Sequence, residues 1–223
     1  MSFVTWRTCG KSLTVGTIYC LGRNYPEHAA EMKAALPSEP VVFLKPASSL
    51  VQDGGSVVIP SISNDVHHEV ELVVVVGPGG RSIPPEKAYD HVLGYGVGLD
   101  MTLRDVQAEA KKKGLPWAVA KGFAGAAPVS TIVERARVPD PHALDIILRV
   151  NGEIRQKSHT SKMLFRIPAV VSYLSQIFHL EEGDLIFTGT PEGVGPVHAG
   201  DTLEAELTGV ARLTVGVRPP AQH

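Results

Sequence analysis

Short apolar runs rich in β-branched residues recur along this chain, and they outnumber the stretches with helical periodicity. Runs of this kind, bounded by Gly, Pro or Asp, are typical of β-strands. The pattern predicts nine strands, over residues 13–19, 41–44, 56–60, 69–76, 92–100, 144–150, 184–189, 202–207 and 211–217. Asn151 and Gly152 directly follow the sixth run, and this pair favours a two-residue hairpin turn.

Helical patterns are confined to three segments, residues 26–36, 103–113 and 168–178. Gly114 closes the second segment and Pro168 opens the third, which are the usual positions of these residues at helix ends. Strands that cluster without regular alternation with helices argue against a doubly wound parallel sheet. We therefore predict a β-dominated α+β fold or β-roll in which residues 1–223 form a single domain.

Composition narrows the class of protein. Hydrophobic residues make up 43% of the chain and charged residues 20%, as in ordinary globular proteins. The net charge of -2 argues against a broad nucleic-acid or membrane surface, and the basic run 111–113 is interpreted as a solvated helix end. The N-terminus lacks the features of a secretory or organellar leader, so we expect a cytosolic protein. Because the chain has only two cysteines, a bound metal is expected to use oxygen or nitrogen ligands.

Three common sequence motifs are incomplete or absent. Residues 5–12 end like a P-loop, but Thr5 stands where that motif needs a glycine. The glycines of residues 94–98 have the wrong spacing for a dinucleotide-binding fingerprint, and the chain contains no G-x-S-x-G elbow. The sequence therefore favours neither nucleotide binding nor serine-hydrolase chemistry of the α/β type.

A pair of glutamates carries the strongest chemical signal. The strand period of two places Glu69 and Glu71 on one face, where they repel each other unless a cation or strong partners neutralise them. A solvated edge strand is the alternative interpretation. Asp100 ends a predicted strand and is a candidate third carboxylate, although it or Thr102 would also serve as the N-cap of the next helix. Three carboxylates without thiolates would suit Mg²⁺ or Mn²⁺.

Histidine and lysine side chains are further candidates for groups of a functional site. His28 and Glu31 lie three residues apart in a predicted helix, so a carboxylate can orient the imidazole as a general base; an exposed helical pair is the commoner meaning of this spacing. Lys121 and Lys45 each end an apolar run, where an ammonium is costly unless it is paired or used. The alternative is a lysine that snorkels to solvent, which we favour for Lys45. Residues 188–196 offer amides and hydroxyls for a small carboxylate, or form a rigid turn.

Taken together, several motifs resemble the fumarylacetoacetate hydrolase superfamily, and specifically its short single-domain acylpyruvase and oxaloacetate decarboxylase branch. The motifs, in order, are GRNYPEH (22–28), VVFLKP (41–46), HHEVEL (67–72), GLDMTLRDVQ (98–107), KKKGLPWAVAKGF (111–123), VNGEIRQ (150–156) and EEGDLIFTGTPEGVGPV (181–197). Ordered motifs at matching spacings are more specific than any one of them alone. The resemblance implies a mixed β-roll, usually paired into homodimers, in which the helix carrying His28 often behaves as a lid.

The resemblance also implies roles for individual residues. Glu69, Glu71 and Asp100 would be the metal ligands. His28 and Glu31 would activate water, and Lys121 would place a positive charge beside the reacting oxygens. The implied substrate contacts are Arg23, Arg104, Gln107 and Thr190.

These roles predict a Mg²⁺- or Mn²⁺-dependent enzyme of small 2-oxo acids that carry a second carbonyl or carboxylate. The expected reaction is hydrolysis of a carbon–carbon bond in an acylpyruvate, which releases pyruvate and a carboxylic acid. Oxaloacetate decarboxylation would pass through the same enolate. Two alternatives stay open: isomerisation or tautomerisation of a related dioate, and a non-catalytic β-scaffold whose carboxylates bind a structural cation.

Overall fold

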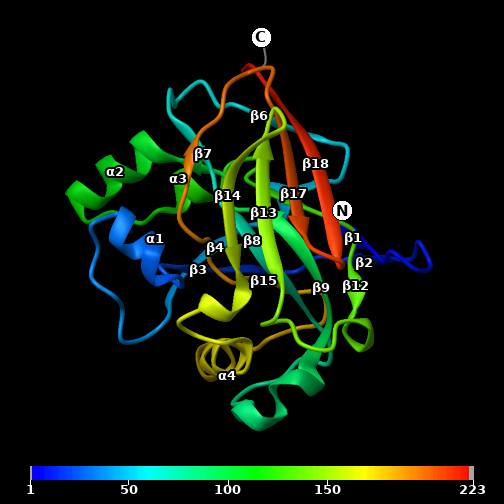
Figure 1. Ribbon diagram of the computed structural model, residues 1–223. Coiled ribbons are helices and arrows are strands. Elements are labelled where there is room, and N and C mark those ends of the chain that lie inside the picture. The colour runs from blue at the N-terminus through cyan, green and yellow to red at the C-terminus, as the bar shows by residue number, and fades with distance from the viewer. Residues whose placement is uncertain (1, 221–223) are drawn as a thin grey trace.

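Two large β-sheets form the centre of the protein, and the helices lie outside them (Figure 1). The structure is a computed structural model and describes residues 2–220. Within this part of the chain, no helix is long and apolar enough to cross a membrane.

The larger sheet is mixed. Its strands are β3 (Ile18–Gly22), β4 (Val41–Lys45), β5 (Leu50–Gln52), β8 (Val70–Val76), β9 (Val92–Leu99), β11 (Ala127–Val129), β12 (Val133–Glu134) and β15 (Leu185–Phe187). They follow the order β4-β3-β15-β8-β9-β11-β5, with β12 also paired to β9. β15 runs parallel to β3 and β11 runs parallel to β5, whereas β8 is antiparallel to both of its neighbours. Every residue of β8 is buried, which explains its continuous run of valines.

The smaller sheet packs against the larger one. Its strands are β6 (Ser56–Val58), β13 (Asp145–Val150), β14 (Glu153–His159), β17 (Thr202–Leu207) and β18 (Ala211–Arg218), in the order β14-β13-β17-β18-β6. β17 and β18 contact β9, and β13 contacts β8. Buried side chains of both sheets form one hydrophobic cluster that includes Leu72, Val97, Leu148, Leu203 and Val215. Burial of this apolar surface is the main stabilising contribution to the fold.

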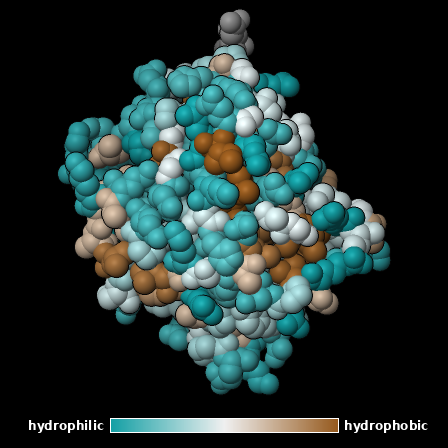
Figure 2. All heavy atoms as spheres, in the orientation of Figure 1, coloured by the Kyte–Doolittle hydropathy of each residue, from teal (hydrophilic) through white to brown (hydrophobic). Residues whose placement is uncertain are grey.

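Shorter strands and the helices complete the structure. β1 (Phe3–Thr5) pairs with β2 (Ser12–Thr14), and β7 (Val66–His68) lies between β10 (Thr102–Leu103) and β16 (Gly195–Pro196). The α-helices are α1 (Pro26–Glu31), α2 (Arg104–Lys113), α3 (Ala118–Lys121) and α4 (Ile167–Ile177). Figure 1 shows α1, α2 and α3 together on one side of the sheets. Most of the face drawn in Figure 2 is hydrophilic, and hydrophobic residues show through it in separate patches.

The β-dominated α+β prediction is confirmed, and each of the nine predicted runs overlaps a strand. The first run is nevertheless two strands, because Asp184 interrupts it: its Oδ1 accepts a hydrogen bond from Thr17 N–H at 2.7 Å. A Cβ on Gly16 would lie 2.5 Å from the same oxygen. Asn151 and Gly152 form the predicted turn with φ of 52° and 81°.

The helix predictions are correct for α2 and α4 and too long for α1. Gly114 ends α2 in the left-handed conformation, as expected. α1 stops at Glu31 because Lys33 adopts a φ of 51°, and Ala34 N–H then bonds back to Ala29 C=O at 2.9 Å. The sequence contains no glycine or asparagine there to signal this end.

Candidate active site

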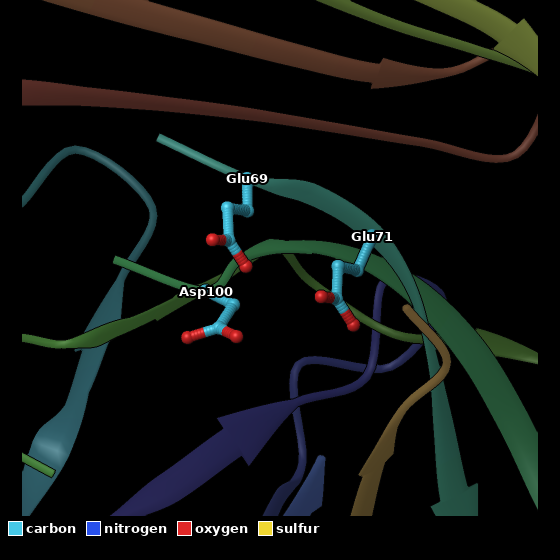
Figure 3. Close-up of side chains that lie close together, drawn as sticks. All are labelled: Glu69, Glu71 and Asp100. Carbon is cyan, nitrogen blue, oxygen red and sulfur yellow. The ribbon is translucent and has the colours of Figure 1, made fainter. Parts of the chain in front are cut away.

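Three carboxylates converge where β8 begins and β9 ends (Figure 3). Glu69 immediately precedes β8, Glu71 lies within it, and Asp100 immediately follows β9. The antiparallel register pairs Val70 with Leu99, and Asp100 N–H donates to Glu69 C=O at 2.8 Å. One oxygen of each carboxylate lies within 4.8 Å of the other two, and all three residues are buried. The solvated edge-strand alternative is therefore wrong.

Cationic side chains surround this acidic cluster. Lys121 Nζ lies 2.8 Å from Glu69 Oε2 and 2.6 Å from Asp100 Oδ2. Lys45 Nζ lies 2.7 Å from Asp100 Oδ1, and Arg104 Nη2 lies 2.5 Å from Glu69 Oε1. Lys45 is 1% exposed and Lys121 is 3% exposed, so neither lysine snorkels to solvent. Our preference for that interpretation at Lys45 was wrong.

The helix-capping alternative for Asp100 and Thr102 is also wrong. α2 starts at Arg104, with Leu103 at its N-cap position. Thr102 Oγ1 instead accepts a hydrogen bond from Lys121 Nζ at 2.6 Å and donates to Asp100 C=O at 3.2 Å. Both side chains therefore belong to the charged cluster.

The three carboxylates of the cluster differ in how well their charges are compensated. Burial raises the pKa of Glu71 well above its ordinary value, and the charges of Asp100 and Glu69 raise it further. Gly189 N–H donates to Glu71 Oε2 at 2.6 Å, but in residues 2–220 no cationic side chain forms an ion pair with Glu71. Burial by itself would raise the pKa of Glu69, yet Lys121 and Arg104 lower it below its ordinary value. Buried oxygen donors in this arrangement fit a hard divalent cation.

His28 and Glu31 form a hydrogen-bonded dyad beside the cluster. His28 Nδ1 lies 3.1 Å from Glu31 Oε2, and Gly193 N–H donates to Glu31 Oε1 at 3.1 Å. His28 is 6% exposed whereas Glu31 lies at the surface, so the exposed-pair alternative is wrong for the histidine only. The contact with Gly193 fixes α1 to the segment that follows β15.

A cavity of about 250 Å³ is lined by both His28 of the dyad and Glu69 of the acidic cluster. It is lined by Leu21, Gly22, Arg23, His28, Met32, Ala34, Phe43, Glu69, Arg104, Gln107, Lys111, Trp117, Lys121 and Thr190. The predicted substrate contacts Arg23, Arg104, Gln107 and Thr190 are all in this lining. Arg104 Nη1 donates to Gln107 Oε1 at 2.8 Å, which leaves the Gln107 amide group to donate into the cavity.

Sequence reasoning assigned two lysines to solvent that the structure adds to the site. For Lys45, the apolar run showed that an ammonium would be costly, but its partner Asp100 lies far along the chain, so the pattern did not show that the lysine is paired. Lys111 lines the cavity, with its Nζ 5.1 Å from the ring centroid of Trp117, so it is not merely a solvated helix end. Burial lowers the pKa of Lys111, and the charges of Arg104 and Arg23 lower it further. The motif KKKGLPW, which contains both Lys111 and Trp117, was the sequence signal that pointed to this part of the site.

Comparison with known proteins agrees with this geometry. The profile of the fumarylacetoacetate (FAA) hydrolase C-terminal family matches residues 17–218. Mouse (Mus musculus) mitochondrial oxaloacetate tautomerase FAHD1 is 51% identical over 201 residues, which cover 90% of this chain and 91% of the mouse protein.

Two solved structures extend the comparison. Fumarylpyruvate hydrolase from Pseudomonas aeruginosa, crystallised in complex with Mn²⁺ and pyruvate, superposes with a TM-score of 0.94 at 40% identity, covering 97% of this chain and 95% of its own. 5-Carboxymethyl-2-hydroxymuconate delta-isomerase from Mycobacterium smegmatis has a TM-score of 0.84 at 34% identity, covering 95% and 82% of the two chains. The mixed β-roll, the buried acidic cluster and these similarities show that the chain is an enzyme of the fumarylacetoacetate hydrolase family.

Proposed function

We propose that this enzyme binds Mg²⁺ or Mn²⁺ and hydrolyses acylpyruvates to pyruvate and a carboxylic acid. The observation that carries the proposal is the buried cluster of Glu69, Glu71 and Asp100, next to a cavity lined by His28 and Lys121. The Mn²⁺ and pyruvate in the related Pseudomonas aeruginosa structure support both the metal and the product class.

Charge balance supports a 2-oxo acid as the ligand. Glu69, Glu71 and Asp100 would hold the cation, which when bound supplies Lewis-acid polarisation of carboxylate and 2-oxo oxygens. When all three carboxylates are ionised, Lys45, Lys121 and Arg104 balance their charge, so an added divalent cation leaves two positive charges. The enolate of pyruvate carries two negative charges, one on its carboxylate and one on its enolate oxygen. The site would therefore be neutral when the enolate forms.

Lys121 supplies a fixed positive charge to this enolate. Burial alone would lower its pKa, but Asp100 and Glu69 raise the pKa above its ordinary value, so the side chain stays an ammonium. An ammonium that is already held in place needs no reorganisation as negative charge develops. Its exposure to the cavity places that charge within reach of a bound 2-oxo acid.

The His28–Glu31 dyad acts as the general base. Glu31 accepts a hydrogen bond from His28 Nδ1–H, which leaves Nε2 as the basic nitrogen. Nε2 takes a proton from water, and the resulting hydroxide attacks the 4-carbonyl. The bond between the third and fourth carbons then breaks, leaving pyruvate enolate and a carboxylic acid. The proton held by His28 can be returned to the third carbon of the enolate.

A second candidate reaction is interconversion of the enol and keto forms of oxaloacetate. The name of the 51% identical mouse relative favours it, and the Mycobacterium smegmatis isomerase supports chemistry without bond cleavage. The same dyad would move a proton at the third carbon, with no attack by water. Oxaloacetate decarboxylation would produce the same enolate by loss of carbon dioxide.

Two further cationic side chains of the cavity favour substrates with a second carboxylate. Arg23 and Lys111 line it and make no ion pair with an acidic side chain in residues 2–220. Their charges would attract the distal carboxylate of a fumarylpyruvate or an oxaloacetate. An acetylpyruvate has no distal carboxylate for them to contact.

The test is a side-by-side assay of acetylpyruvate cleavage, fumarylpyruvate cleavage, oxaloacetate tautomerisation and oxaloacetate decarboxylation. We expect turnover with Mg²⁺ or Mn²⁺ and its loss in excess chelator. Unchanged turnover in chelator, with no metal bound to the protein, would contradict the central proposal. Tautomerisation without any cleavage would select the second reaction.

Several sequence predictions stay predictions: a single catalytic domain over residues 1–223, a homodimer and a cytosolic location. The small-molecule substrate is supported by the enzymes to which the chain is similar. A non-catalytic scaffold has less support, because a structural cation site would need neither the buried Lys121 nor a dyad that borders a cavity.

A further inference from the structure

Gln156 lies in the smaller sheet, yet its side chain reaches the candidate active site. It is 1% exposed. The pairing of β13 with β14 shifts register here, because Leu148 faces Gln156 while Arg149 faces Ile154, which leaves Arg155 as an extra residue. Such a bulge redirects the neighbouring side chain.

All hydrogen-bonding capacity of the Gln156 amide is used. Oε1 accepts from Val70 N–H at 3.0 Å and lies 3.0 Å from His68 Nδ1. Nε2 donates to Pro191 C=O at 3.0 Å and to Thr190 Oγ1 at 2.9 Å. A backbone N–H can only donate and a backbone carbonyl can only accept. Val70 and Pro191 therefore fix which end of the amide is the oxygen and which is the nitrogen.

This orientation determines the role of the Thr190 hydroxyl. Facing an amide N–H, Thr190 Oγ1 must accept, so its own proton points elsewhere. Thr190 lines the cavity, and within residues 2–220 its hydroxyl makes no second hydrogen bond. The proton is thus available to an acceptor inside the cavity.

The segment around Thr190 is held firmly enough to keep this direction. Gly189 N–H donates to Glu71 on one side, and Gly193 N–H donates to Glu31 on the other. Gly193 packs so closely that a Cβ would lie 2.4 Å from Arg155 C=O. A donor fixed in this way binds an acceptor without first losing rotamer freedom.

We propose that Gln156 is a positioning residue that holds the Thr190 hydroxyl as a hydrogen-bond donor to an anionic oxygen of the bound ligand. The identity of that ligand, a 2-oxo acid, rests on the proposed function. Gln156 itself acts only through Thr190 and touches no substrate.

The test is pyruvate binding to the full chain at saturating Mn²⁺, measured by calorimetry. Gln156→Glu keeps the shape but removes both donors, so the Thr190 hydroxyl turns its proton toward residue 156. Gln156→Met removes the donors without adding charge. Loss of a hydrogen bond to a charged acceptor predicts about 10- to 100-fold weaker binding in Gln156→Glu. Gln156→Met should show a smaller loss, because the Thr190 hydroxyl keeps its proton but no longer has a fixed direction. Gln176→Glu, on the exposed face of α4, is the matched control and should bind as the wild type does.

Thr190 variants separate positioning from general damage. Thr190→Val should weaken pyruvate binding by the same factor as Gln156→Glu, and Thr190→Ser should keep it within about twofold of wild type. In the Thr190→Val background, Gln156→Met should add little further loss, because residues that act through one another are not additive. Equal losses from Gln156→Met in both backgrounds would overturn the proposal. So would normal pyruvate binding by Thr190→Val, a result that does not depend on the Gln156 variants folding.

The positioning role of Gln156 and the proposed function would be contradicted by different results. If pyruvate binds as predicted but none of the substrates is turned over, the proposed function fails and the positioning role of Gln156 stands. If wild-type protein turns over substrate but shows no Mn²⁺-dependent pyruvate binding, the positioning proposal fails.

Discussion

Replacing Lys121 by methionine should change metal affinity and turnover in opposite directions. The substitution keeps the length of the side chain and deletes an ammonium that contacts Glu69 at 2.8 Å and Asp100 at 2.6 Å. Without that ammonium the acidic cluster gains a net negative charge and the oxygens lose a competing donor. A divalent cation should then bind more tightly, while the charge that faces the developing enolate is lost.

The magnitudes follow from burial. Removing one partner of a buried ion pair costs about 3–5 kcal/mol, because the other charge stays buried and uncompensated. At about 2–4 °C per kcal/mol for a chain of this size, the unfolding temperature of the metal-free variant should fall by about 6–20 °C. Saturating Mg²⁺ compensates the carboxylates and should recover part of this loss. Each 1.4 kcal/mol recovered corresponds to about tenfold tighter metal binding.

The assays are thermal unfolding with chelator and with Mg²⁺, metal titration by calorimetry, and turnover at saturating Mg²⁺. Turnover should fall by about 100-fold or more, as for other single electrostatic stabilisers. Lys112→Met is the matched control, because Lys112 is exposed and, within residues 2–220, pairs only with Glu109 on the same helix. Weaker metal binding by the Lys121 variant, or turnover close to that of the control, would refute the reasoning.

Three further predictions concern other parts of the site. His28→Ala should slow acylpyruvate hydrolysis by about 100- to 10,000-fold and oxaloacetate decarboxylation much less; parallel losses would indicate that α1 acts as a lid. In excess chelator, Glu71 has a higher pKa in the folded protein than the 4.5 of the unfolded chain. The contribution of Glu71 to the free energy of unfolding therefore falls as the pH rises above 4.5. The unfolding temperature of Glu71→Gln minus that of the wild type should therefore increase between about pH 5 and about pH 8. A difference that stays constant over this range would contradict the prediction. Lys111→Met should raise the KM of fumarylpyruvate by about 3- to 5-fold and leave that of acetylpyruvate unchanged, whereas equal changes for both acids would remove the assigned role.

The acidic cluster was predictable because strand geometry acts over short distances. A period of two is enough to place Glu69 and Glu71 together, and an antiparallel neighbour that ends at Asp100 brings the third carboxylate to the same edge. The α2 boundary was predictable for a similar reason, since Gly114 tolerates the left-handed conformation that ends a helix.

Contacts between distant segments were not predictable. An apolar run that ends in lysine is the same pattern whether the ammonium reaches water or, as at Lys45, a buried carboxylate 2.7 Å away. The break at Gly16 depends on Asp184, and the role of Gln156 depends on Val70 and Pro191. In each case the deciding partner comes from a distant part of the chain, and local pattern does not encode it.

The two walls of the cavity differ in how they are built. One wall consists of strand ends and the tightly packed segment around Gly189 and Gly193, where an added Cβ would lie 2.6 Å from Asn24 or 2.4 Å from Arg155. A second, helical wall contains Lys111 of α2 and Trp117, which directly precedes α3; both residues lie outside the two sheets. A mutational library restricted to residues 111–117 would therefore vary the size and charge of the accepted acid while leaving the acidic cluster intact. Evolution has the same opportunity: new substrates can be acquired on the helical wall while the sheet wall preserves the chemistry.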